Sequence, residues 1–106
     1  MTTLVLEKEP IAVRVKVGQG CLTVELADGR SVVVPLAWYP RLAQGTAAER
    51  RNWQLLGNGY AIEWPDLDEH IGVEGLLAGR RSGESPISLK RWLASRRAKR
   101  VRNRRT

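Results

Sequence analysis

Two short apolar segments on either side of an Asp-Gly pair constrain the fold more than any other feature of this sequence. Residues 22–26 (LTVEL) alternate apolar and polar side chains, and a second apolar segment follows at residues 31–35 (SVVVP). Alternation is typical of a strand with one buried face, and Asp-Gly is typical of the turn between antiparallel strands. The sequence therefore predicts a β-hairpin at residues 22–35.

The length of the loop sets the register of this hairpin. A two-residue loop would place Val24 opposite Val33, whereas a three-residue loop at residues 27–29 places Val24 opposite Val32. Only the three-residue loop gathers the apolar residues of both strands on one face, and burial of one face fixes register. These residues are Leu22, Val24, Val32 and Val34. We therefore expect the three-residue loop, with Gly29 in the left-handed conformation of a bulge.

The rest of the chain adds two further strands and several short helices. Residues 11–17 (IAVRVKV) and 60–64 (YAIEW) read as half-buried strands. The residues on the apolar face of the first of these are Ile11, Val13, Val15 and Val17. The expected helical segments span residues 36–42, 46–56 and 71–79, and residues 65–70 are expected to form a polar connector.

Two of the expected helices carry start signals. Thr46 and Glu49 have the spacing of a capping box, and Ser85 followed by Pro86 is a favoured cap and first helical residue. The apolar stripe of the last helix is formed by Leu89, Trp92 and Leu93. Beyond Ala94 this stripe ends, so we expect the helix to be held to the body at its start, and to project and fray beyond it.

Together these elements predict an α+β fold. It consists of a small antiparallel sheet of about four strands packed with short helices, plus a C-terminal helix with a basic tail. A chain of 106 residues suffices for one such domain. We assign residues 1–79 to the compact α+β domain and residues 80–106 to a linker, the C-terminal helix and a basic arm.

Charge is distributed unevenly along the chain. Residues 1–79 contain seven Lys or Arg and ten Asp or Glu, a net charge of −3, whereas residues 80–106 contain eleven Lys or Arg and one Glu, a net charge of +10. Such asymmetry indicates a polyanionic or acidic partner. DNA, RNA and an acidic protein surface are all possible partners, and a solvated tail without a partner is the alternative. The candidate contacts in the arm are Arg96, Arg97, Lys99, Arg100, Arg102, Arg104 and Arg105.

No pattern in the sequence indicates catalysis, a cofactor or a metal. The glycine pairs at residues 18–20 and 57–59 lack the ending that a phosphate-binding loop requires, so we interpret them as turns. The polar cluster at residues 63–70 has neither calcium-loop nor zinc spacing. Cys21 is the only cysteine, which excludes an intrachain disulfide, and we expect it to be a small buried residue beside a turn. We predict a non-enzyme with no metal, cofactor or catalytic residues.

Localisation follows from two further patterns. The first residues do not combine a basic start with a long apolar stretch, as a secretory signal would, and no apolar run approaches the roughly 20 residues of a membrane span. We therefore expect a cytoplasmic protein without a membrane partner.

Four segments of the chain resemble a known bacterial family. They are residues 35–42 (PLAWYPRL), 53–59 (WQLLGNG), 62–69 (IEWPDLDE) and 71–79 (IGVEGLLAG). Over roughly residues 10–95 the chain resembles the small-protein family called domain of unknown function 2442. The resemblance implies a compact α+β domain with an antiparallel sheet, and a gene that stands beside that of a small toxin, with this family as the antitoxin. No catalytic residues are established for the family, so none are carried over.

The sequence thus favours a non-catalytic binding protein, the antitoxin-like member of a toxin–antitoxin pair whose partner is a small toxin-like protein. The alternative is a nucleic-acid-binding accessory protein that acts through the arginine-rich arm. Tyr39 and Trp64 each precede a proline and are expected to be partly exposed. The candidate protein-contact surface comprises Tyr39, Arg41, Trp64, Asp66, Asp68 and Glu69.

Overall fold

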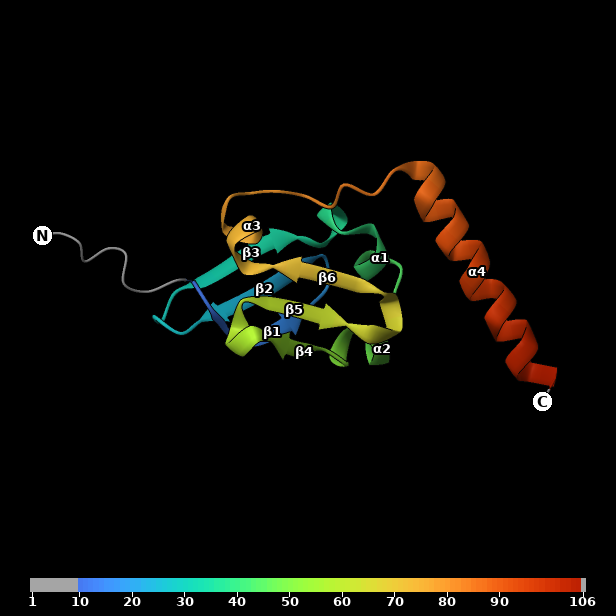
Figure 1. Ribbon diagram of the computed structural model, residues 1–106, viewed down its shortest axis with the longest axis horizontal. Coiled ribbons are helices and arrows are strands. Elements are labelled where there is room, and N and C mark those ends of the chain that lie inside the picture. The colour runs from blue at the N-terminus through green and yellow to red at the C-terminus, as the bar shows by residue number, and fades with distance from the viewer. Residues whose placement is uncertain (1–9, 106) are drawn as a thin grey trace, which may run out of the picture.

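The computed structural model describes the backbone of residues 10–105 and the side chains of residues 10–100. Six strands form two three-stranded antiparallel sheets, with strand orders β1–β2–β3 and β4–β5–β6 (Figure 1). The strands are β1 (Ala12–Val17), β2 (Cys21–Leu26), β3 (Ser31–Pro35), β4 (Gln54–Leu56), β5 (Ala61–Trp64) and β6 (Glu69–Gly72). The α-helices are α1 (Pro40–Ala43), α2 (Ala47–Arg51), α3 (Val73–Leu77) and α4 (Pro86–Arg105). The α+β class is confirmed, but the strands number six rather than about four.

The register of the β2–β3 hairpin agrees with the prediction. Val24 pairs with Val32 and Leu22 pairs with Val34. The Leu26 N–H donates to the Arg30 carbonyl at 2.8 Å, which leaves residues 27–29 as a three-residue loop. Gly29 has a φ of +96°, the left-handed conformation that the bulge requires.

Strand β1 departs from the predicted alternation. A β-bulge lies between Ala12 and Arg14, and Val13 is the extra residue. Because the bulge adds one residue to the strand, the side chains N-terminal to it point to the opposite face from the one that simple alternation predicts. Ala12 is therefore buried, whereas Val13, which we expected on the apolar face, is 52% exposed.

The expected helix at residues 46–56 is much shorter in the structure. α2 starts at the predicted capping box, in which Thr46 and Glu49 satisfy each other's backbone N–H groups, but it ends at Arg51. The indole N–H of Trp64 donates to the Arg50 carbonyl at 3.1 Å. That carbonyl is the acceptor that the next helical turn would need, so the chain leaves the helix and continues as β4.

The expected polar connector at residues 65–70 is also different. Pro65–Leu67 form a short 3-10 turn, and Asp68 takes a left-handed conformation with a φ of +51°. This turn reverses the chain, and β6 then pairs with β5, with Ile71 opposite Ile62. The predicted helix at residues 71–79 shrinks to α3, and Gly79, with a positive φ, follows it.

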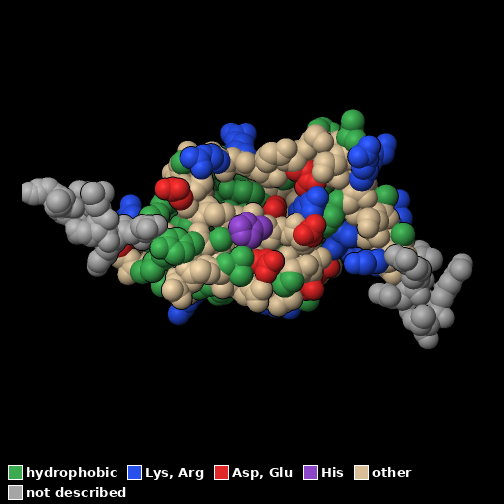
Figure 2. All heavy atoms as spheres, viewed as in Figure 1, with side chains coloured by type: hydrophobic (Ala, Val, Ile, Leu, Met, Phe, Trp, Pro, Cys, Tyr) green, Lys and Arg blue, Asp and Glu red, His purple; other side chains and the backbone are tan. Residues whose placement is uncertain are grey.

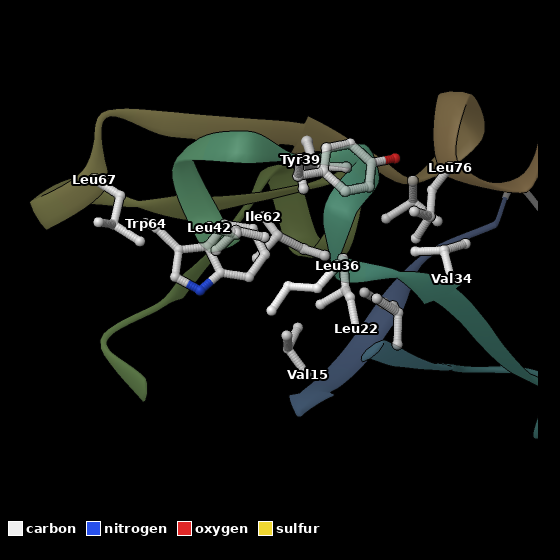
Figure 3. Packing of buried hydrophobic residues seen from close by; sticks show 14 of the residues in the cluster. Val15, Leu22, Val34, Leu36, Tyr39, Leu42, Ile62, Trp64, Leu67 and Leu76 are labelled. Atoms are coloured by element: carbon white, nitrogen blue, oxygen red, sulfur yellow. The ribbon is translucent and has the colours of Figure 1, made fainter. Parts of the chain in front are cut away.

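The core lies between the two sheets, because buried residues of both belong to one cluster (Figure 3). Trp64 is fully buried within it, as are Leu22, Leu42 and Ile62. Leu36 and Leu42 reach this cluster from the segment 36–43, where a 3-10 turn (Leu36–Trp38) precedes α1. Pro40 begins α1 instead of limiting a helix, since its fixed φ suits a first helical position.

Helix α4 extends away from the sheets at one end of the molecule (Figure 1). Ser85 caps it: the Ser88 N–H donates to the Ser85 hydroxyl at 3.1 Å, and Pro86 is the first helical residue, as predicted. The helix is continuous to Arg105 and does not end near Ala94. Among the described residues, no helix is both long and apolar enough to cross a membrane.

Candidate functional site

The first turns of α4 are held to the body by an aromatic ring and two arginines. The guanidinium carbon of Arg41 lies 5.0 Å from the centre of the Trp92 ring, and that of Arg96 lies 4.7 Å from it. Trp92 is partly buried against the core cluster. Both distances are within the range of a cation–π interaction. We call Trp92, the two arginines and their carboxylate partners Glu84 and Glu49 the Trp92 clamp.

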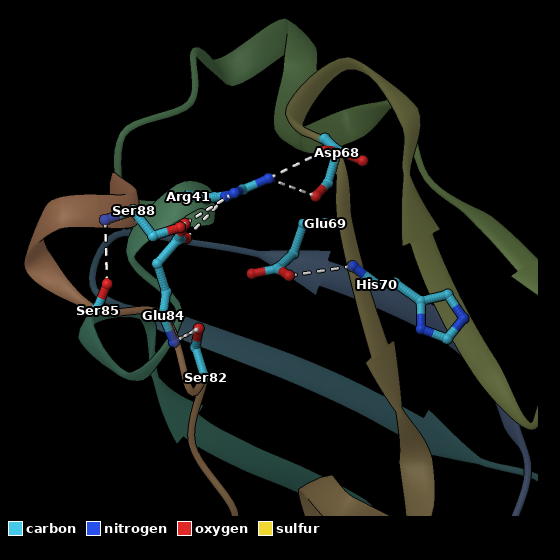
Figure 4. Close-up of polar contacts among 8 residues, drawn as sticks. All are labelled: Arg41, Asp68, Glu69, His70, Ser82, Glu84, Ser85 and Ser88. Atoms are coloured by element: carbon cyan, nitrogen blue, oxygen red, sulfur yellow. Dashed lines mark hydrogen bonds and ion pairs between the residues drawn. The ribbon is translucent and has the colours of Figure 1, made fainter. Parts of the chain in front are cut away.

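Arg41 connects α1 to the segment that leads into α4 (Figure 4). Its Nε and Nη2 atoms donate to the two Glu84 carboxylate oxygens, each at 2.7 Å, and Nη1 donates to Asp68 Oδ2 at 3.1 Å. The Ser88 hydroxyl also donates to Glu84 at 2.7 Å. These hydrogen bonds, chiefly those from Arg41, hold the pKa of Glu84 below its ordinary value of 4.5. The Glu84 carboxylate is therefore fixed beside the start of α4.

Arg96 makes the corresponding contact from α4 to α2. Its Nη1 and Nη2 atoms donate to the two oxygens of Glu49 at 3.1 and 2.8 Å. The same carboxylate accepts the Thr46 N–H of the capping box at 2.9 Å. Hydrogen bonding from Arg96 lowers the pKa of Glu49. Arg96, predicted as a contact of the arm, is thus bound to the body, with 13% of its side chain exposed.

The other described cations of the arm are free of such contacts. Arg97, Lys99 and Arg100 are exposed, and none forms an ion pair with a described residue. Lys90 and Arg91, nearer the start of α4, are exposed as well. Sequence reasoning missed these two because they lie among the apolar residues that hold the helix. The side chains of Arg102, Arg104 and Arg105 lie outside the described residues.

Acidic and basic side chains face each other where α4 meets the body. A cleft of about 600 Å³ lies between them, with carboxylates on the body side and cations on the helix side. Its charged lining residues are Glu49, Asp66, Asp68, Arg96, Lys99 and Arg100. Red and blue side chains also alternate on the visible face at this end of the body (Figure 2).

Two of the six residues of the predicted protein-contact surface are buried. Tyr39 is 4% exposed and Trp64 is 0% exposed, so the expectation of partial exposure was wrong for both. The prolines that follow them begin helical turns, and this places the aromatic rings inward. The Tyr39 hydroxyl donates to the Arg80 carbonyl at 2.9 Å. Arg41 is engaged in the Trp92 clamp, which leaves Asp66 and Asp68 as the exposed members.

Glu69, the remaining member of that surface, is partly buried. One carboxylate oxygen accepts the His70 backbone N–H at 3.1 Å, whereas Oε2 is buried and has no hydrogen-bond partner among the described residues. Burial raises the pKa of this carboxyl above its ordinary value. Glu69 therefore carries a charge that the fold only partly compensates.

The polar cluster at residues 63–70 does not converge on a common point. Glu63 accepts from the Gln54 amide at 2.6 Å, and Asp66 accepts from the Asn52 amide at 3.0 Å. Asp68 faces Arg41. No group of three His, Cys, Asp or Glu side chains within residues 10–100 could hold a metal ion. Cys21, which we expected to be buried, is exposed at the start of β2.

The fold and the site define a small α+β protein with two three-stranded sheets, in which residues of α1 and α2 hold a cationic C-terminal helix by an aromatic and ionic clamp. Residues 10–82 match the model of the family described as "Protein of unknown function (DUF2442)", and the chain belongs to this family. The resemblance found in the sequence is thus confirmed. The match ends before α4 begins.

Two solved structures share the fold. A crystal structure of a protein of unknown function from Rhodospirillum rubrum is 24% identical, with a TM-score of 0.64, and the similarity covers 73% of this chain and 95% of that chain. A solution structure of an uncharacterised protein from Chromobacterium violaceum is 22% identical, with a TM-score of 0.59, and covers 81% of this chain and 75% of that chain. No curated protein matches the chain.

Proposed function

We propose that this is a non-catalytic binding protein whose helix α4 binds nucleic acid through phosphate contacts. The observation that supports this proposal is the set of exposed cations on α4 that lack a carboxylate partner among the described residues. These cations are Lys90, Arg91, Arg97, Lys99 and Arg100. Phosphate contacts fix the position of the protein on the nucleic acid but do not read its bases, so we expect binding with little preference for base sequence.

The Trp92 clamp supports the proposal because it orders the helix that bears the cations. Most of the stability of a helix in a protein comes from tertiary packing of its apolar face, and α4 has few apolar residues beyond Leu93. Anchoring at Arg96 and Trp92 fixes the first turns against the body. The cations beyond them are presented from an already formed helix, and less conformational entropy is lost on binding.

The body restricts where a polyanion can approach. Asp66 and Asp68 are exposed beside the clamp, and together with Glu49 they line the cleft on the inner side of α4. A phosphate in that cleft would meet three carboxylates. Nucleic acid therefore stays on the solvent side of α4 and meets the exposed Lys99 and Arg100 at the helix-side rim of this cleft, without entering it.

The test is fluorescence anisotropy of a labelled duplex at low salt with the full chain and with the triple variant Arg97→Gln/Lys99→Gln/Arg100→Gln. This variant leaves Arg96 in place, so α4 stays anchored. We expect the affinity to fall by about a hundredfold, because three phosphate contacts are removed.

A matched control removes the same charge elsewhere. The variant Arg14→Gln/Arg30→Gln/Arg80→Gln lowers the net charge equally, and all three side chains are exposed and lie outside α4. We expect its affinity to stay within about threefold of the wild-type value, since only the screened long-range attraction changes. Equal losses in the two triple variants would show that net charge, rather than α4, governs binding and would overturn the proposal.

A small toxin-like protein is the second candidate partner, and the observation that favours it is the exposed acidic pair Asp66 and Asp68. A basic surface on the partner would complement this pair. Co-purification with the product of the neighbouring gene tests this candidate. Binding that survives Asp66→Asn/Asp68→Asn would place the contact elsewhere.

A further inference from the structure

A second cleft, on the body, is lined by cations and one indole and by no carboxylate. It has a volume of about 490 Å³ and lies where α2 packs against β1 and the β1–β2 turn. We call it the Trp53 cleft. Its lining residues with polar or aromatic side chains are Lys16, Gln19, Arg50, Arg51 and Trp53.

The positive charges of the Trp53 cleft are not neutralised by the protein. Lys16 and Arg51 are exposed, and no hydrogen bond or ion pair links either side chain to another described residue. Arg50 is held in place by the carbonyls of Leu42 and Ala43, to which it donates at 2.8 and 2.6 Å. Neutral carbonyl oxygens leave the Arg50 charge uncompensated. Three cations therefore act on whatever occupies the cleft.

Trp53 supplies the aromatic surface. It is partly buried against the core cluster, and its remaining surface lines the cleft. An aromatic ring beside cations is the combination by which proteins bind single-stranded nucleic acid, where bases stack and phosphates pair with Lys or Arg. The larger cleft beside α4 lacks this character, because Glu49, Asp66 and Asp68 line it.

We propose that the Trp53 cleft binds one nucleotide unit of a single-stranded nucleic acid, with the base on Trp53 and the phosphate on Lys16 and Arg51. This inference rests on the proposed function and adds the form of the nucleic acid to it. The cations of α4 attract the phosphates of either form, but only a single strand presents an unstacked base to Trp53. Helix α2 connects the two sites, since its Glu49 anchors α4 and its Arg51 lines the Trp53 cleft.

The experiment compares a single-stranded oligothymidylate with a duplex of the same length, using the full chain. In the variant Lys16→Gln/Arg51→Gln, whose two sites are exposed, we expect affinity for the single strand to fall about tenfold. Its affinity for the duplex should equal the duplex affinity of the control Arg14→Gln/Arg80→Gln, which removes the same charge at two exposed sites outside the cleft. Equal losses for both forms, or no loss for the single strand, would overturn the inference.

Tryptophan fluorescence provides a readout that a purely structural role would not change. Stacking of thymine on Trp53 quenches its emission, so the conservative variant Trp53→Phe should retain the affinity for oligothymidylate within about threefold and lose the quench. A quench of equal size in this variant would place the base on another tryptophan and refute the site.

The two proposals fail in different ways. Loss of binding in the cleft variant but not in Arg97→Gln/Lys99→Gln/Arg100→Gln would refute the role of α4 and support the Trp53 cleft. If the α4 variant loses binding to both the single strand and the duplex, and the cleft variant keeps the wild-type ratio of the two affinities, the role of α4 is supported and that of the cleft is refuted. A full chain that binds neither form at low salt would overturn both.

Discussion

Replacing Trp92 by alanine should release α4 from the body while the two sheets stay folded. The ring lies 5.0 Å from the Arg41 guanidinium and 4.7 Å from that of Arg96. The side chains of these arginines are only 18% and 13% exposed, so each contact belongs in the upper part of the range for cation–π interactions, about 1–2 kcal/mol. Together they contribute about 2–4 kcal/mol to holding α4 in place.

Amide hydrogen exchange measures this release directly. A loss of about 2 kcal/mol raises the population of the open helix, and hence the exchange rate of amides in the first turns of α4, about 30-fold. Exchange of amides in β2 and β5 should change far less, because Trp92 packs against the core cluster only from its edge and the buried residues between the sheets are not replaced. Ile87→Ala is the control on the same helix, since Ile87 is 65% exposed. Unchanged exchange in Trp92→Ala would refute the clamp.

Three further predictions concern stability. Gly29→Val should lower the free energy of unfolding by about 1–2 kcal/mol, because a β-branched residue is strained at a φ of +96°. The control Gly18→Val should have a much smaller effect, because φ is not positive there and the space around the residue is open. Equal urea midpoints for the two variants would contradict this prediction. Glu69→Gln should raise the stability relative to wild type increasingly as the pH rises above 4.5, because a carboxyl whose folded pKa is raised loses its contribution when it ionises; a pH-independent difference would contradict this. Glu49 and Glu84 have lowered folded pKa values, so α4 should stay docked above pH 4.5 and be released as the pH falls through those values, which exchange at acidic pH would detect.

The hairpin could be predicted because its register depends on local pattern. Leu22 and Val24 need partners on the same face, and only a three-residue loop provides them, as the pairing of Val24 with Val32 confirms. The helix starts at Thr46 and Pro86 were predictable for the same reason, since capping depends on residues within one turn.

The missed elements depend on contacts that are distant in sequence. The end of α2 at Arg51 follows from the indole N–H of Trp64, which takes the Arg50 carbonyl from fourteen residues away. Strand β6 contains a single strongly apolar residue, Ile71, so its pattern gives no strand signal, and pairing with β5 forms it. The bulge in β1 likewise cannot be inferred from residues that alternate through it.

The candidate site was only partly predictable. The excess of arginine after residue 95 indicated a cationic arm, but it did not separate Arg96, which binds Glu49, from Arg97, which is exposed. That difference depends on where each residue falls around the helix relative to α2. The burial of Tyr39 depends likewise on the packing of α1 against the core.

The most direct test of the central claim, that α4 presents phosphate-binding cations, is the salt dependence of nucleic-acid affinity. The slope of log affinity against log salt concentration measures the number of phosphates that the protein neutralises, with about 0.9 per contact on duplex DNA. We predict that Arg97→Gln/Lys99→Gln/Arg100→Gln reduces the magnitude of this slope by about 2–3 relative to the full chain. A slope equal to that of the unaltered protein would show that Arg97, Lys99 and Arg100 do not contact phosphate and would contradict the account.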